Sequence, residues 1–114
     1  MTEKSQVTFD DFLKLDIRVG KIIEAKPFEK ARKPSYKLVV DMGPEIGKKN
    51  SSAQITEHYT PQELIGKQVL AVVNFPPRNI AGFQSEILVM GTYSEGGVVL
   101  ITPDKPVQPG DILG

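Results

Sequence analysis

The sequence has 114 residues, of which 39% are hydrophobic, and it contains no cysteine and one histidine. This length corresponds to a single domain, residues 1–114, with a core of modest size. The absence of cysteine excludes disulfide frameworks and thiolate zinc sites, and it suits the reducing cytoplasm in which we expect the protein to work. No apolar run approaches the ~20 residues that span a bilayer, and none follows the N-terminus, so we expect neither membrane insertion nor a signal peptide.

The charges balance overall but are distributed unevenly. Fourteen basic residues match fourteen acidic ones, yet the first 50 residues carry a surplus of three positive charges. The surplus of positive charge is most concentrated in the segment 26–37, which contains five Lys or Arg residues and only one acidic residue, Glu29. Such a patch can attract phosphate groups or an acidic partner. Alternatively, it is a solvated loop whose charge serves solubility.

The first elements expected along the chain are a short helix and three strands. Thr8 can cap a helix whose first turn contains Asp10 and Asp11, next to the positive end of the helix dipole. Gly20 suggests a bulge or sharp bend in the first strand, and Pro27 and Pro34 bracket the basic loop. We expect these three strands at residues 16–26, 36–42 and 51–56.

The clearest local pattern predicts a second short helix. Thr60, Pro61 and Glu63 stand in the order of a capping residue, a proline in the first helical position and a capping-box glutamate. Gly66 is expected to end this helix, which is then barely two turns long. The remaining strands are expected at residues 68–75, 86–92 and 97–102, followed by an extended tail rich in proline.

This order of elements predicts an all-β fold, an OB-fold. That fold is a five-stranded Greek-key β-barrel, here with a short helix between strands three and four and with N- and C-terminal extensions. Barrels of this kind bind oligonucleotides or other ligands on the face of strands two and three and the flanking loops.

No constellation of catalytic or metal-binding residues is apparent. His58 has no second histidine or cysteine with which to bind a metal, so we interpret it as a surface residue. The segment 43–50 resembles a phosphate-binding loop, but its glycines are too closely spaced and Asn50 stands in place of the required Ser or Thr. We therefore expect no catalytic residues, no metal, no cofactor and no enzyme activity.

Two segments have the composition of ligand-binding surfaces. The connection 74–86 displays Phe75, Ile80 and Phe83 around Arg78 and Asn79, a mixture that suits stacking on bases or contact with an apolar peptide. Alternatively, it is a hairpin whose phenylalanines are tucked under the barrel. The second segment is the basic loop, where Phe28 and Tyr36 alternate with Lys30, Arg32 and Lys33, as on surfaces that bind single-stranded RNA or tRNA.

Five motifs along the chain resemble those of CsaA-type proteins, which are described as export-related chaperones of the tRNA-binding OB-fold superfamily. That superfamily also includes the C-terminal appendices of methionyl-tRNA synthetases. The motifs occupy residues 16–22, 36–38, 51–56, 64–69 and 73–78 and follow one another at the intervals expected for the family. The resemblance implies an OB barrel and a homodimer paired through its terminal extensions and adjoining strands, which would place two binding faces on one particle.

One motif departs from the tRNA-binding relatives. The segment after the fourth strand keeps Asn74, Pro77, Gly82 and Ser85 of the pattern Asn-Leu-Lys-Pro-x-Lys-Met-x-Gly-x-x-Ser. At the pattern's basic positions this chain instead has Pro76, Asn79 and Ala81, and Ile80 replaces the methionine. Fewer positive charges weaken attraction to phosphate, which favours an unfolded peptide over tRNA.

The sequence thus supports two ligand hypotheses. In the first, a chaperone-like module holds apolar segments of unfolded or preprotein chains in a groove near Tyr36, Phe75, Ile80 and Phe83. In the alternative, the protein binds tRNA through Lys30, Arg32, Lys33, Lys37, Asn74, Arg78 and Ser85. A third interpretation is a scaffolding dimer without a ligand of its own.

Overall fold

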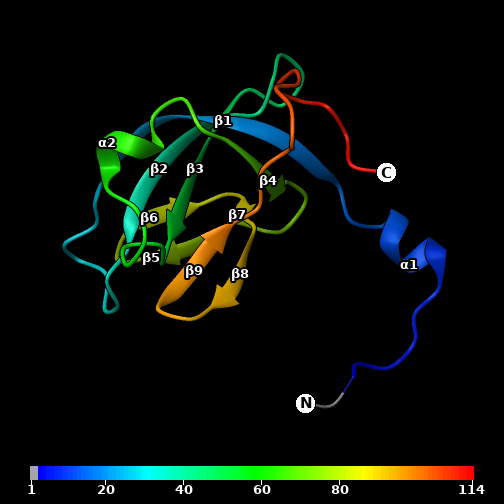
Figure 1. Cartoon of the computed structure of the whole chain (residues 1–114), viewed down its shortest axis with the longest axis horizontal. Helices are drawn as coiled ribbons and strands as arrows, with labels where there is room; N and C mark the ends of the chain where they lie inside the picture. Colours follow the sequence, from blue (N-terminus) through cyan, green and yellow to red (C-terminus); the bar gives the residue numbers. More distant parts are fainter. Residues whose placement is uncertain (1–2) are drawn as a thin grey trace.

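A computed structural model describes residues 3–114 and consists mainly of antiparallel strands wrapped around one core (Figure 1). The main sheet has the strand order β3-β2-β1-β4-β7. Its strands are β1 (Ile17–Pro27), β2 (Tyr36–Asp41), β3 (Lys48–Ala53), β4 (Gln68–Val72) and β7 (Leu88–Val89). Two hairpins extend it, one of β5 (Arg78–Ile80) with β6 (Phe83–Ser85), the other of β8 (Gly91–Ser94) with β9 (Gly97–Leu100). Helix α2 (Pro61–Leu64) lies between β3 and β4, as the predicted OB-fold requires.

The barrel is closed by side chains where β3 meets the segment after β6. The Glu86 N–H donates to the Asn50 carbonyl at 2.8 Å, the Ser52 N–H donates to Ser85 Oγ at 3.0 Å, and Ser51 Oγ donates to the Ile87 carbonyl at 3.2 Å. Only the first of these bonds joins two backbone groups, so a regular strand ladder is absent at this seam. The seam therefore depends on small polar residues at 51 and 85.

The core fills the barrel with aliphatic side chains from β1, β2, β4 and α2. Ile22, Leu38, Val40, Leu64 and Val69 are completely buried. In β2 the buried residues alternate with partly exposed ones, as expected for a strand with one face towards the core. Leu64 is the buried residue of α2, and it packs into the same cluster.

Gly20 does not mark the bulge that the sequence suggested. The register shift in β1 lies between Ile22 and Glu24. At Gly20 a Cβ atom would stand 2.3 Å from Met42 Sδ and 2.6 Å from Val40 Cγ1. Glycine is needed at this position because the buried side chains of Val40 and Met42 fill the space that a Cβ atom would occupy.

Most strand boundaries shift relative to the prediction. The third strand begins at Lys48 and ends at Ala53, earlier than expected, and the fourth ends at Val72. The expected strand 86–92 is two separate strands, β7 and β8, and the last one ends at Leu100. Pairing partners cause these shifts, since β7 pairs with β4 whereas β8 pairs only with β9.

Both predicted helix starts are confirmed. Thr8 caps α1 (Phe9–Leu13) and Thr60 caps α2, each within a complete capping box. In α1 the backbone N–H of Thr8 donates to Asp11 at 3.0 Å, and this bond, together with Lys14, lowers the pKa of the Asp11 carboxyl. Each helix is very short, five residues in α1 and four in α2.

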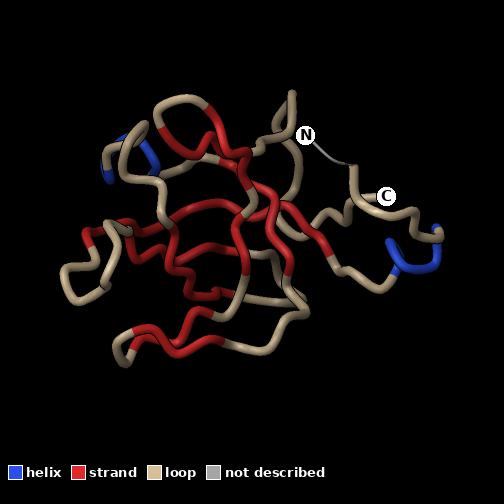
Figure 2. Tube along the Cα trace, turned by 90° about the horizontal axis from the view of Figure 1, so that it is seen from below, coloured by secondary structure: helices blue, strands red, loops and turns tan. Residues whose placement is uncertain are grey.

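The C-terminal tail and the N-terminal arm both adjoin the start of β1. The C-terminal tail lies along this strand, with the Gly110 N–H donating to the Val19 carbonyl at 2.7 Å and the Leu113 N–H to the Ile17 carbonyl at 2.8 Å. The N-terminal arm, residues 3–15, leaves the barrel beside the tail, and α1 stands apart from the strands (Figures 1 and 2). No residue of α1 is buried.

Arg18 joins three segments beneath this tail. Its guanidinium donates to the Asp16 carboxylate at 2.8 and 3.0 Å and to Glu45 in the turn after β2 at 2.8 Å. The bonds to Asp16 and then to Glu45 raise the pKa of Arg18 above its usual value. Since the Arg18 side chain is largely buried, these bonds fix its position.

None of the helices within residues 3–114 is long and apolar enough to cross a membrane.

Candidate ligand-binding face

The basic loop and the β5–β6 hairpin meet through two aromatic rings. Phe28, directly after β1, and Phe83, at the start of β6, lie edge to face with ring centroids 5.4 Å apart. Phe28 is only 4% exposed, whereas Phe83 is half-buried. An edge-to-face pair of this kind adds attraction beyond burial. The contact fixes the hairpin tip against the base of the basic loop.

Lys37 completes this aromatic pair. Its Nζ lies 4.9 Å from the Phe28 ring centroid and 5.4 Å from the Phe83 ring centroid, within the range of a cation–π interaction. Within residues 3–114, the ion pairs involve Lys14, Arg18 and Lys49, and no carboxylate pairs with Lys37. The aromatic rings therefore hold an ammonium group whose charge is not neutralised.

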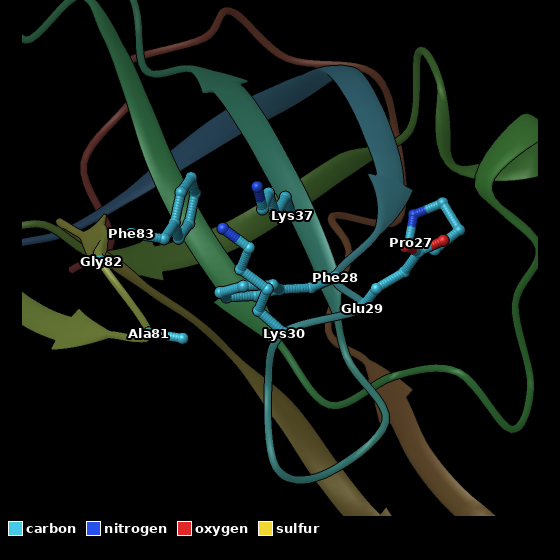
Figure 3. A pocket seen from close by; sticks show the side chains of 8 residues that line it. All are labelled: Pro27, Phe28, Glu29, Lys30, Lys37, Ala81, Gly82 and Phe83. Carbon is cyan, nitrogen blue, oxygen red and sulfur yellow. The ribbon is translucent and has the colours of Figure 1, made fainter.

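An open pocket of about 430 Å³ lies at this meeting point (Figure 3). Its lining consists of Pro27, Phe28, Glu29, Lys30, Lys37, Ala81, Gly82 and Phe83. Figure 3 shows Lys30 and Lys37 beside Phe83, with Ala81 and Gly82 at the hairpin turn. The pocket thus combines the half-buried Phe83 ring, two lysines, the Glu29 carboxylate and the exposed hairpin turn.

The hairpin turn has an unusual residue. Ala81 and Gly82 have φ values of 49° and 86°, so both are in the left-handed region that two-residue hairpin turns require. Asn79 supports the turn, because its Oδ1 accepts the Gly82 N–H at 2.9 Å. Alanine rarely adopts this conformation, which the Phe28–Phe83 contact helps to maintain.

The basic residues proposed from the sequence surround the pocket at different distances. Lys30 lines it, and Arg32 is exposed further along the same loop. Lys33 lines a second hollow of about 320 Å³, between the basic loop and the β8–β9 hairpin. Arg78 is exposed at the opposite end of the β5–β6 hairpin from its turn. The cations therefore form a broad rim rather than a compact cluster.

Asn74 and Ser85 have polar atoms engaged within the protein. The Asn74 carboxamide binds the backbone between α1 and β1, and Ser85 Oγ accepts the Ser52 N–H at the barrel seam. Their contact with RNA remains a prediction from the family pattern.

The four apolar residues proposed for a peptide groove do not converge. Tyr36 is a core residue, since only 9% of it is exposed and its hydroxyl donates to the Tyr59 carbonyl at 2.6 Å. Phe75 is 45% exposed, but it follows Asn74 beside the N-terminal arm, away from the hairpin turn. Ile80 and Phe83 pair with each other across the hairpin. We therefore leave Tyr36 and Phe75 out of the ligand-binding face and include Phe28.

The sequence indicated Phe28 as an aromatic residue of the basic loop, but it did not indicate the contact with Phe83. Phe28 follows Pro27 at the end of a strand and precedes the basic residues. The partner Phe83 is 55 positions further along the chain, so their contact depends on the barrel's closure. Within the described residues, no group of three or more His, Cys, Asp or Glu side chains is placed to hold a metal ion.

Comparisons with known proteins match almost the whole chain. The family described as "Putative tRNA binding domain" matches residues 17–112. Curated methionine–tRNA ligases from Archaeoglobus fulgidus and Thermotoga maritima are 37% and 36% identical to this chain over 110 and 108 residues. These matches cover 96% and 95% of this chain but only 16% and 17% of the ligases. The chain thus spans about a sixth of the length of these relatives.

Solved structures match nearly all of this chain and the whole of their own chains. The CsaA chaperone protein from Picrophilus torridus has a TM-score of 0.91 and 53% identity, and chaperone CsaA from Bacillus anthracis has a TM-score of 0.90 and 47% identity. Each match covers 96% of this chain and 100% of the solved chain.

Proposed function

The chain belongs to the putative tRNA-binding domain family, among its CsaA-type members, and we propose that it is a non-catalytic protein that holds extended apolar segments of unfolded or preprotein chains. The proposed site is the face formed by residues 28–37, which include the basic loop, and the β5–β6 hairpin. We propose the cytoplasm as its compartment, in keeping with the cysteine-free sequence. The two solved structures that match 96% of this chain are CsaA chaperones, which supports this choice.

The observation that carries the proposal is the pocket at Phe28 and Phe83. An apolar side chain can enter the pocket of about 430 Å³ and contact the half-buried Phe83 ring. The ammonium groups of Lys30 and Lys37 are positioned to meet carbonyl or carboxylate oxygens of the same segment. Because these side chains are long and flexible, one pocket can accept many sequences, as a holding function requires.

We also propose that the protein works as a homodimer. The N-terminal arm exposes Val7, Phe9 and Leu13 to 75%, 72% and 58%. A helix of five residues is unstable in isolation, because too few hydrogen bonds offset the cost of nucleation. A second copy that covers these apolar side chains would stabilise the arm and place two pockets on one particle.

The Phe83→Ser substitution is expected to weaken polypeptide binding about tenfold, since truncating an aromatic anchor in a pocket typically lowers affinity by at least this factor. The measurement is a titration of the Phe83→Ser variant with an unfolded, chemically reduced and alkylated polypeptide, followed by fluorescence anisotropy. Ile65→Ser is the matched control, because Ile65 is an exposed apolar residue at the end of α2, outside the pocket. Equal losses in both variants, or no binding by the unmodified protein, would contradict the proposal.

A second candidate function, tRNA binding by the same face, is favoured by the unpaired cations. Lys30, Arg32 and Arg78 are exposed and, among residues 3–114, none of them pairs with a carboxylate. Their charges are thus available to phosphates, whose contacts contribute affinity without sequence information.

The salt dependence of tRNA affinity tests this second candidate. If Arg78 contacts a phosphate, Arg78→Ala should reduce the slope of log affinity against log salt by about one. Lys105→Ala removes an exposed charge of the C-terminal tail and should leave the slope unchanged. Absence of tRNA binding at low salt would exclude this function.

A further inference from the structure

The carboxamide of Asn74 bridges two backbone groups where the N-terminal arm joins the barrel. Its Oδ1 accepts the Asp16 N–H at 2.9 Å, and its Nδ2 donates to the Lys14 carbonyl at 2.8 Å. Asn74 lies just after β4, 58 and 60 positions along the chain from these partners. A primary amide offers a donor and an acceptor on one planar group, which matches this pair of backbone atoms.

Asp16 is held by the barrel through each of its polar groups. Its N–H binds Asn74, its carbonyl accepts the Val73 N–H at 2.9 Å, and its carboxylate accepts two bonds from Arg18. The last residue before β1 is therefore fixed in position. Lys14, two residues earlier, has its carbonyl bound to Asn74.

Beyond this point the arm depends on its own contacts. The hydrogen bonds of residues 8–13 stay within the segment 8–15, as between Thr8 and Asp11. Phe9 and Phe12 stack on each other with centroids 6.2 Å apart, and α1 has no buried residue. The direction in which the arm leaves the barrel is thus set at residues 14–16.

We propose that Asn74 is a positioning residue that sets the orientation of the N-terminal arm on the barrel. Arg18 and Val73 bind only Asp16 of the arm's end. Among the side chains of residues 3–114, Asn74 is the one that binds both Lys14 and Asp16, so it fixes the chain direction between them. This role goes beyond the proposed ligand binding and does not depend on which ligand the pocket takes. It assigns to Asn74 an internal function in place of contact with RNA.

Distances between spin labels on the full chain test this proposal. The chain has no cysteine, so Asp10→Cys in α1 and Gln62→Cys in α2 create a unique label pair on two exposed positions. Labelled chains are diluted into an excess of unlabelled protein so that only distances within one chain are measured. We expect a single narrow distance distribution for Asn74 and a clearly broadened one for Asn74→Ala. The unfolding temperature should fall by only a few degrees.

A matched control comes from a second amide with the same bonding pattern. Gln68 Nε2 donates to the Val107 carbonyl at 2.6 Å, and its Oε1 accepts the Val107 N–H at 3.0 Å, but these bonds hold the C-terminal tail. Gln68→Ala should therefore leave the arm distances unchanged. Equal broadening in both variants would indicate general loosening and overturn the proposal.

A third variant covers the case in which Asn74→Ala does not fold. Asn74→Asp keeps the acceptor for the Asp16 N–H and loses the donor to Lys14, so intermediate broadening is expected. A distribution as narrow as that of the unmodified protein, in whichever variant folds, would overturn the inference. Failure of polypeptide binding with the distance result intact would instead contradict the proposed function alone.

Discussion

The Gly20→Val substitution is expected to lower the free energy of unfolding by about 3 kcal/mol, the upper part of the range for overpacked cores. The added Cβ alone would lie 2.3 Å from Met42 Sδ and 2.6 Å from Val40 Cγ1. Both of these side chains are completely buried, so they cannot move aside without disturbing the core. Urea unfolding of the Gly20→Val variant measures the loss.

Gly114→Ala is the control for this substitution. A Cβ at Gly114 meets no atom within 4 Å, so its stability should equal that of the unmodified protein. If Gly20→Val unfolds at the same urea concentration as the control, the side chains of Val40 and Met42 do not pack against Gly20 as closely as the structure has it.

The Phe9→Asp substitution is expected to raise the dissociation constant of the proposed homodimer about a hundredfold, because a charge would replace an aromatic anchor of the interface. Phe9 is 72% exposed in the single chain, and the substitution leaves the barrel core intact. An acidic residue in the first turn also favours the helix dipole, so α1 itself should persist. Sedimentation of the Phe9→Asp variant over a range of concentrations measures the effect.

Gln6→Asp provides the matched control, since it introduces the same charge at an exposed polar position of the same arm. Its dimerisation should be close to that of the unmodified protein. Two results would contradict the role of the arm: a monomeric unmodified protein, or equal weakening in both variants. In either case the exposed side chains of α1 would need another partner.

The features predicted correctly from the sequence are those with local causes. The capping boxes at Thr8 and Thr60 involve residues three positions apart, so the sequence alone indicates them. The order of elements around α2, and with it the OB-fold, follows from such local patterns. Glycine at position 20 was recognised as special, although its actual reason is a close approach to residues twenty positions away.

The features predicted less well depend on contacts between distant segments. The expected fifth strand is divided because its two halves pair with different partners, β4 and β9. Tyr36 looked like a surface aromatic, but Tyr59 supplies a carbonyl that allows it to be buried. The bonds of the Asn74 amide to Lys14 and Asp16 were not predicted either, since these partners lie 60 and 58 positions away along the chain. Spacing along the chain carries no information about such pairs.

The most direct test of the binding face is an NMR titration that maps changes in the chemical shifts of the backbone amides. Protein labelled with ¹⁵N is titrated with the unfolded polypeptide and, separately, with tRNA, and the shifted amides are placed on the structure. We predict that the polypeptide shifts concentrate at residues 28–37 and 78–85, around Phe28, Lys37 and Phe83. Shifts confined to α2 and the C-terminal tail, with the pocket residues unchanged, would contradict the account.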